Sequence, residues 1–102
     1  MTQNLLDTTL IELLAVLKFI SFLDISENPF LSDNVLQQIA KTCTYLRTLN
    51  MQSIGATTAG VETVMENCQY LEKLNCKGSK NIDAARIKLY IKTNQLKVNV
   101  IV

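Results

Sequence analysis

The sequence lacks several residue types on which common functions depend. It has no histidine and no tryptophan, and only 6% of its residues are aromatic. Histidine is the commonest general base and the commonest neutral metal ligand, so its absence removes the simplest catalytic and metal sites. The three glycines form no phosphate-binding loop, because no Gly-Lys-Ser or Gly-Lys-Thr follows a strand. We therefore expect no enzymatic activity, no cofactor and no metal ion.

The cysteine content argues against a disulfide-rich secreted protein. There are three cysteines, and an odd number cannot all pair with one another. We expect Cys43, Cys68 and Cys76 to be small buried thiols, because a zinc site would need a fourth ligand that their spacing does not supply. The pattern favours a reducing intracellular compartment, with the cytoplasm as the first choice and an organelle as the alternative.

No membrane span or targeting segment stands out. The N-terminus has neither a basic region nor a small-residue cleavage site, so we expect no signal peptide. The apolar stretch from residue 5 to residue 25 is not expected to span a membrane, because it is interrupted by Asp7, Glu12, Lys18 and Asp24. The net charge of +1 provides no general basicity, and nucleic acid is therefore not an expected partner.

What the sequence does contain is a globular composition and one repeated unit. Hydrophobic residues make up 48% of the chain and charged residues 19%, as is typical of a folded domain. Residues 43–51 (CTYLRTLNM) return 25 positions later as residues 68–76 (CQYLEKLNC), and a degenerate copy (LKFISFLDI) occupies residues 17–25. A period in the twenties with leucines at fixed positions predicts a leucine-rich repeat.

The repeated unit resembles the cysteine-containing subfamily of leucine-rich repeats. Cys43 and Cys68 stand at the cysteine position near the end of a helix, and residues 31–33 (LSD) match the turn that leads into the next helix. Asn28 stands where the family has Asn or Cys, although the two later copies have Ile and Ser there.

This resemblance implies an α/β fold: a short right-handed solenoid with parallel strands on the concave side and helices on the convex side. Proteins of this family bind other proteins, which makes protein binding the expected function. The family includes F-box substrate receptors of ubiquitin ligases, but the residues before Leu17 are too few to form an F-box.

The repeat also predicts where the elements lie. We expect residues 1–102 to form one domain of about three full repeats and a closing strand, or to be a fragment or small subunit. The last strand admits two registers, one that aligns Leu96 with Leu71 and one, shifted by a residue, that places Val100 and Val102 in the core. Helices are expected at residues 5–18, 34–42, 59–67 and from 82, and strands at 20–25, 46–51, 71–76 and from 96.

Strand side chains alternate between the two faces of a sheet, which separates core positions from candidate site positions. Leu23, Leu49 and Leu74 should stack side by side in the core. Phe22 is the one large apolar side chain on the opposite face, and aromatic residues often anchor interfaces. The alternative is that this face is merely solvated. The predicted partner-binding residues are Phe22, Asp24, Ser26, Thr48, Asn50, Gln52, Lys73, Asn75 and Lys77.

The two ends of the repeat array are further candidate contact surfaces for protein partners. The first helix is apolar on most of its circumference, and the last strand is apolar and would lie at a sheet edge. Residues 1–33 carry five acids and one base, net −4, whereas residues 70–102 carry seven bases and two acids, net +5. Three functions fit these features: a protein-binding module, a structural subunit of an organellar or cytoskeletal assembly, and the recognition part of a ubiquitin ligase.

Overall fold

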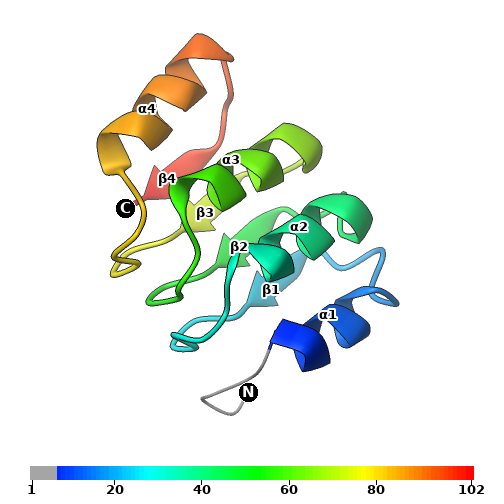
Figure 1. Ribbon diagram of the computed structural model, residues 1–102. Helices are drawn as coiled ribbons and strands as arrows, with labels where there is room; N and C mark the ends of the chain where they lie inside the picture. Colours follow the sequence, from blue (N-terminus) through cyan, green and yellow to red (C-terminus); the bar gives the residue numbers. More distant parts are fainter. Residues whose placement is uncertain (1–6) are drawn as a thin grey trace.

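The computed structural model describes residues 7–102, in which helices and strands alternate along the chain. The strands form one parallel sheet in the order β1-β2-β3-β4. The helices lie along one side of this sheet, so successive strand–helix units are neighbours in space (Figure 1). The predicted α/β class is therefore confirmed. The elements are α1 (Asp7–Leu14), β1 (Phe22–Asp24), α2 (Asp33–Thr42), β2 (Thr48–Asn50), α3 (Thr58–Asn67), β3 (Lys73–Asn75), α4 (Ala84–Thr93) and β4 (Asn99–Ile101).

The repeated leucines stack in one row across the sheet, as the sequence predicted. Leu23 pairs with Leu49, and Leu49 pairs with Leu74. The next member of the row is Val100, which pairs with Leu74. The register shifted by one residue is therefore correct for the last strand, and the alignment based on Leu96 is wrong.

Strands β1 and β2 start 26 residues apart, as do β3 and β4, whereas β2 and β3 start only 25 apart. The difference arises because the loop after β2 is one residue shorter than the others. β1 begins 10 residues before the helix N-cap Ser32, β2 begins 9 before Thr57, and β3 begins 10 before Asp83. The shorter loop contains Gly55, where a Cβ atom would lie 2.6 Å from the carbonyl oxygen of Pro29. Only glycine fits this close approach. The 25-residue period therefore holds only for the unit that contains Gly55.

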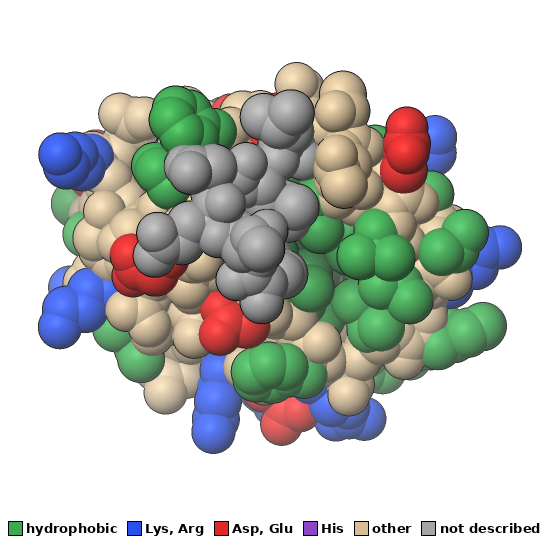
Figure 2. All heavy atoms as spheres, turned by 90° about the horizontal axis from the view of Figure 1, so that it is seen from below, with side chains coloured by type: hydrophobic (Ala, Val, Ile, Leu, Met, Phe, Trp, Pro, Cys, Tyr) green, Lys and Arg blue, Asp and Glu red, His purple; other side chains and the backbone are tan. Residues whose placement is uncertain are grey.

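Helix α1 is shorter than predicted. Residues 5 and 6 of the expected helix lie outside the described residues, and the helix ends at Leu14 rather than at residue 18. The N–H of Leu17 donates to the carbonyl of Leu14 in a tighter turn, and the Thr42 hydroxyl also donates to that carbonyl at 3.2 Å. Both bonds satisfy the carbonyl of Leu14, the last residue of α1, and Leu13 and Val16 at this end of the helix are exposed. Hydrophobic side chains gather on this end of the molecule (Figure 2).

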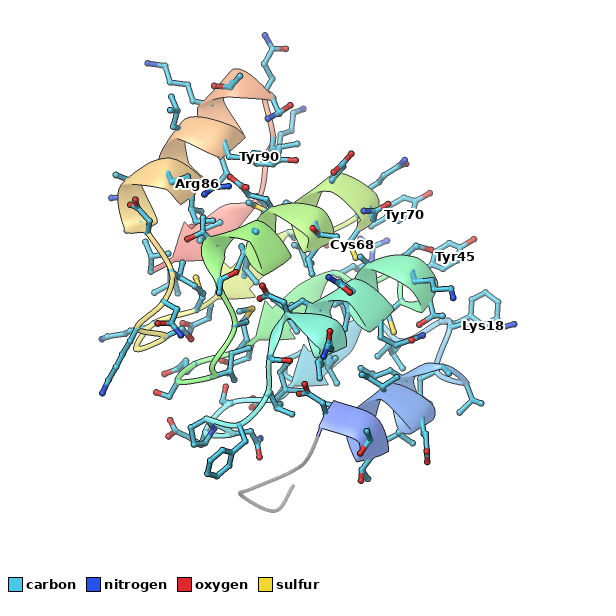
Figure 3. The ribbon with its side chains drawn as sticks, viewed as in Figure 1. Lys18, Tyr45, Cys68, Tyr70, Arg86 and Tyr90 are labelled. Atoms are coloured by element: carbon cyan, nitrogen blue, oxygen red, sulfur yellow. The ribbon has the colours of Figure 1, made fainter. Side chains whose placement is uncertain are left out.

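The repeated cysteines join successive helix ends. The thiol of Cys43 donates to the carbonyl of Leu17 at 3.6 Å, and the thiol of Cys68 donates to the carbonyl of Cys43 at 3.5 Å. Cys68 lies at the C-terminal end of α3 (Figure 3). The carbonyl of Cys43 also accepts from the N–H of Leu46 at 3.2 Å, so the Cys68 thiol adds a second bond to a carbonyl at the end of the preceding helix. All three cysteines are buried free thiols, as predicted.

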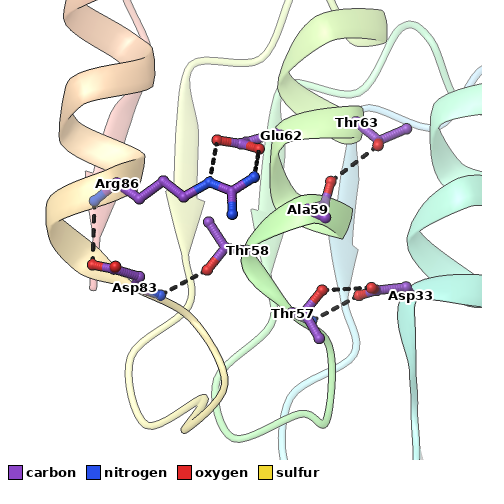
Figure 4. Close-up of polar contacts among 8 residues, drawn as sticks. All are labelled: Asp33, Thr57, Thr58, Ala59, Glu62, Thr63, Asp83 and Arg86. Atoms are coloured by element: carbon purple, nitrogen blue, oxygen red, sulfur yellow. Dashed lines mark hydrogen bonds and ion pairs between the residues drawn. The ribbon is translucent and has the colours of Figure 1, made fainter.

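The helix starts are joined in a similar way. Asp33, in the first turn of α2, accepts hydrogen bonds from the N–H and the hydroxyl of Thr57 at 2.7 and 2.6 Å (Figure 4). The hydroxyl of Thr58 accepts from the N–H of Asp83 at 2.8 Å. Thr57 is the N-cap residue of α3, but its hydroxyl makes no capping hydrogen bond and binds Asp33 of the preceding unit instead. None of the helices in residues 7–102 is long and apolar enough to cross a membrane.

Two buried polar side chains hold the turns that follow β1 and β2. Asn28 donates from Nδ2 to the carbonyls of Ile25 and Ser26 at 3.1 and 2.9 Å. In the second unit this position is held by Ile54, which has no polar side chain. The hydroxyl of Ser79, from the third unit, reaches back to the carbonyl of Met51 at 3.0 Å and accepts from the N–H of Ile54 at 3.2 Å.

Candidate protein-binding face

One face of the sheet brings most of the predicted site residues together. We call it the open sheet face. Neighbouring strands lie about 4.8 Å apart, so each row of the face is continuous. The first row contains Phe22, Thr48, Lys73 and Asn99, and the second contains Asp24, Asn50, Asn75 and Ile101. The other three predicted residues, Ser26, Gln52 and Lys77, follow the ends of their strands.

A hollow of about 190 Å³ lies over the middle of the open sheet face. Its lining includes Asn99 and Ile101 of β4, which sequence reasoning missed because two registers were open there. Val102, which the shifted register placed in the core together with Val100, is exposed, so that part of the prediction is wrong. Asn99 and Ile101 lie 26 residues after Lys73 and Asn75, and this spacing would have placed them on the same face. The other lining residues are Phe22, Thr48, Leu49, Asn50, Lys73, Leu74 and Asn75.

Two polar side chains of the second row also shape the turns after their strands. Oδ1 of Asp24 accepts from the N–H of Ser26 at 2.9 Å, and Oδ1 of Asn75 accepts from the N–H of Lys77 at 3.1 Å. Side chains of this kind bind the backbone two residues on and so favour turns. Part of the polarity of this row therefore serves the fold.

A small network links the first two units beside the hollow. The hydroxyl of Ser26 donates to Oδ1 of Asn50 at 2.8 Å and accepts from the N–H of Gln52 at 3.1 Å. Nε2 of Gln52 also donates to Oδ1 of Asn50, at 3.3 Å. Because Oδ1 of Asn50 accepts both bonds, its Nδ2 group is the part that it can offer to a ligand.

The open sheet face is apolar over β1 and basic over β3. Phe22, in β1, has 62% of its surface exposed. Lys73 and Lys77, in and after β3, are exposed as well. A bound chain that crosses the strands would therefore meet an aromatic ring first and ammonium groups about 10 Å further on.

A second exposed surface, which sequence reasoning did not single out, is a row of three aromatic rings. The ring of Phe19 lies 5.5 Å from that of Tyr45, and Tyr45 stacks on Tyr70 at 5.8 Å with the planes 7° apart. Tyr45 and Tyr70 point to the same side of the molecule (Figure 3). Each is about half exposed, and Phe19 more so. The signal was present, because the three occupy the same position of the repeat.

An apolar cleft of about 340 Å³ lies between the end of α3 and the segment that leads into β4. Met65, Cys68 and Leu71 form its buried part, and Leu96 and Val98 line the other side. Burial, with a smaller effect of the nearby Cys43, raises the pKa of the Cys68 thiol from about 9.0 to about 11. This thiol is therefore neutral at ordinary pH and is a poor nucleophile.

The buried thiols predict how stability depends on pH. Burial also raises the pKa of Cys76 to about 11. Between about pH 9 and pH 11 the unfolded chain therefore loses thiol protons that the folded chain retains. We expect the free energy of unfolding, measured with urea, to fall as the pH rises through this window. The fall should be smaller in the Cys68→Ala/Cys76→Ala variant, and an equal fall in both proteins would contradict the assignment.

No model of a protein family matches the chain, and no curated protein matches it significantly in sequence. Among residues 7–102, no three His, Cys, Asp or Glu side chains come together in a way that could hold a metal ion. The function of the open sheet face is therefore inferred from its own geometry.

Proposed function

We propose that the chain is a short leucine-rich-repeat solenoid that binds a protein partner, without catalysis, on its open sheet face. The observation that carries this proposal is the register of the strands, which aligns Phe22, Thr48, Lys73 and Asn99 beside a hollow. Repeat proteins commonly bind partners on the extended surface of their sheet. The 25-residue spacing and the cysteine position support the assignment to leucine-rich repeats.

The face also defines the chemistry of the partner segment. Phe22 offers an apolar contact over β1, and Lys73 offers a positive charge over β3. Between them, Thr48 and Asn50 offer hydrogen-bonding groups. Two strand spacings amount to about 10 Å, which an extended peptide covers in about three residues. We therefore infer that the partner presents an apolar residue and, about three positions away, an acidic residue.

The experiment that tests this proposal compares two phenylalanines of similar exposure. Phe22 lies on the open sheet face with 62% exposure, and Phe30 lies off it, in the loop before α2, with 65% exposure. Partners captured from cells by the wild-type chain are identified by mass spectrometry and remeasured as purified proteins. Phe22→Ala is expected to weaken binding by roughly tenfold or more, because aromatic anchors carry much of an interface's energy.

The controls separate binding from folding. Phe30→Ala should bind as the wild type does, and both variants should keep the wild-type melting temperature. Asn50→Ala should weaken binding with little effect on stability, and Lys73→Glu should weaken it by repelling the acidic residue of the partner. Equal binding by the Phe22→Ala and Phe30→Ala variants would remove the open sheet face from consideration.

A further inference from the structure

We propose that the two edges of the sheet bind each other, so that copies of this chain join head to tail through β4 of one copy and β1 of the next. This contact uses a surface different from the open sheet face. β1 and β4 are the two edge strands of the described sheet, and β1 is flanked by α1 as β4 is by α4. The occupant of each edge is therefore a second copy of the same chain, which presents the opposite edge.

The core row of the sheet is incomplete at both edges. Leu49 and Leu74, in the middle of the row, are 0% and 1% exposed. Leu23 and Val100 occupy the same row at its two ends and are only half-buried. If β1 of a second copy continues the row after β4, Val100 packs against Leu23 of that copy. Leu23 and Val100 then each have a neighbour on both sides, as Leu49 and Leu74 do in the middle strands.

The backbone pattern of the sheet can continue across the same junction. Within the chain, the N–H of Lys73 donates to the carbonyl of Arg47 at 3.1 Å, and the N–H of Met51 donates to the carbonyl of Asn75 at 2.7 Å. In each strand pair, the first residue of the later strand donates to the carbonyl of the residue just before the earlier strand. If β1 of the next copy follows β4 in the same way, the N–H of its Phe22 donates to the carbonyl of Val98. Unpaired edge strands readily accept such additions.

The helices at the two ends carry complementary side chains. On α4, Arg86 binds Glu62 of α3, which shows which side of the helix faces the preceding unit. Lys88 lies about 200° round the helix from Arg86, so it points away from α3 towards the free end, and Lys92, one turn on, lies on the same side. On α1, Leu13 is 52% exposed.

The long stems of Lys88 and Lys92 can cover the apolar surface of Leu13 while their charges stay in water. Glu12, exposed beside Leu13, provides a negative charge for them. The charge of each end as a whole favours the same contact. Five acids and one base lie in residues 7–33, whereas seven bases and two acids lie in residues 70–102. In a chain whose units stack in order, these charges lie at opposite ends, so like ends repel and unlike ends attract.

Sedimentation of the 102-residue chain at several concentrations and salt levels tests this proposal. A head-to-tail contact does not close on itself, so the average mass should keep rising with concentration and should fall when salt is added. Leu13→Lys should weaken association by roughly tenfold or more, because it removes the apolar contact and places an ammonium group against those of Lys88 and Lys92. Leu89→Lys is the matched control, because it makes the same change at a leucine that is 64% exposed on α4 and lies about 200° from the buried Ile87.

Charge reversal tests the polarity of the contact. Glu27, like Glu12, is an exposed acid of the N-terminal end, in the turn after β1. Glu12→Lys/Glu27→Lys raises the net charge of residues 7–33 from −4 to 0 and sets two new lysines against Lys88 and Lys92. Lys88→Glu/Lys92→Glu lowers the net charge of residues 70–102 from +5 to +1 and sets two acids against Glu12 and Glu27. Each variant alone should therefore stay monomeric where the wild type associates. A mixture of the two should associate again, because every junction then joins opposite charges. A wild-type chain that is monomeric throughout or stops at a closed dimer would overturn the proposal. So would equal effects of the two leucine variants, or a mixture that stays monomeric although both variants are folded.

Discussion

Replacement of Leu49 by alanine is expected to lower the free energy of unfolding by about 2–5 kcal/mol. Leu49 is fully buried in the middle of the core row and pairs with Leu23 on one side and Leu74 on the other. The shorter side chain loses apolar burial and leaves a cavity between two strands that cannot close without moving their partners. Urea denaturation followed by circular dichroism measures this change.

Leu23→Ala is the matched control for this prediction. It deletes the same atoms at the same position of the repeat, but Leu23 is only half-buried at the edge of the sheet. Its cost should therefore be clearly smaller than that of Leu49→Ala. Equal losses would mean that the middle of the row is no better packed than its edge. A loss near 5 kcal/mol is comparable with the whole stability of many small domains, so Leu49→Ala could leave the chain partly unfolded in buffer.

Asn28→Ala is expected to have the second largest effect, about 1–3 kcal/mol. Asn28 is 1% exposed, and its Nδ2 group donates to the carbonyls of Ile25 and Ser26. Alanine removes the donor, so two backbone carbonyls lose a hydrogen bond, one of them in a buried contact that water does not readily replace. The same urea titration measures the loss.

Asn67→Ala provides the control for the loss of this kind of hydrogen bond. Asn67 also donates from Nδ2 to a backbone carbonyl, that of Thr63 at 2.8 Å, but it is exposed at the end of α3. Water can take over an exposed bond, so this variant should lose only a few tenths of a kcal/mol. If Asn28→Ala costs no more than Asn67→Ala, the buried amide does not hold the first turn together.

Much of the candidate site could be predicted from the sequence, because the alternation of strand side chains and the repeat period act together. Alternation separated Leu49 from Thr48 and Asn50, and the period placed their equivalents in neighbouring strands. Six of the nine predicted site residues accordingly lie in the two rows of the open sheet face. The β4 members Asn99 and Ile101 were missed, because local pattern alone could not choose between two registers that differ by one residue.

The hydrogen bonds of the site could not be predicted, because they depend on distances across units. Ser26 and Asn50 are 24 residues apart, and nothing in either segment indicates that their side chains meet. The same holds for Ser79, which serves a carbonyl of the preceding unit because Ile54 cannot. The row of Phe19, Tyr45 and Tyr70 was visible as a repeated position, but only the ring distances show that it is continuous.

The sequence by itself determined the class of fold, the order of the units and the identity of the core row. It could do so because a period near 25 residues and a strand period of two leave few ways to bury the leucines. Only the tertiary structure decided where α1 ends, which register β4 adopts and which polar groups pair. Those features depend on one shortened loop at Gly55 and on contacts between residues a full repeat apart, where small differences in position decide which bond forms.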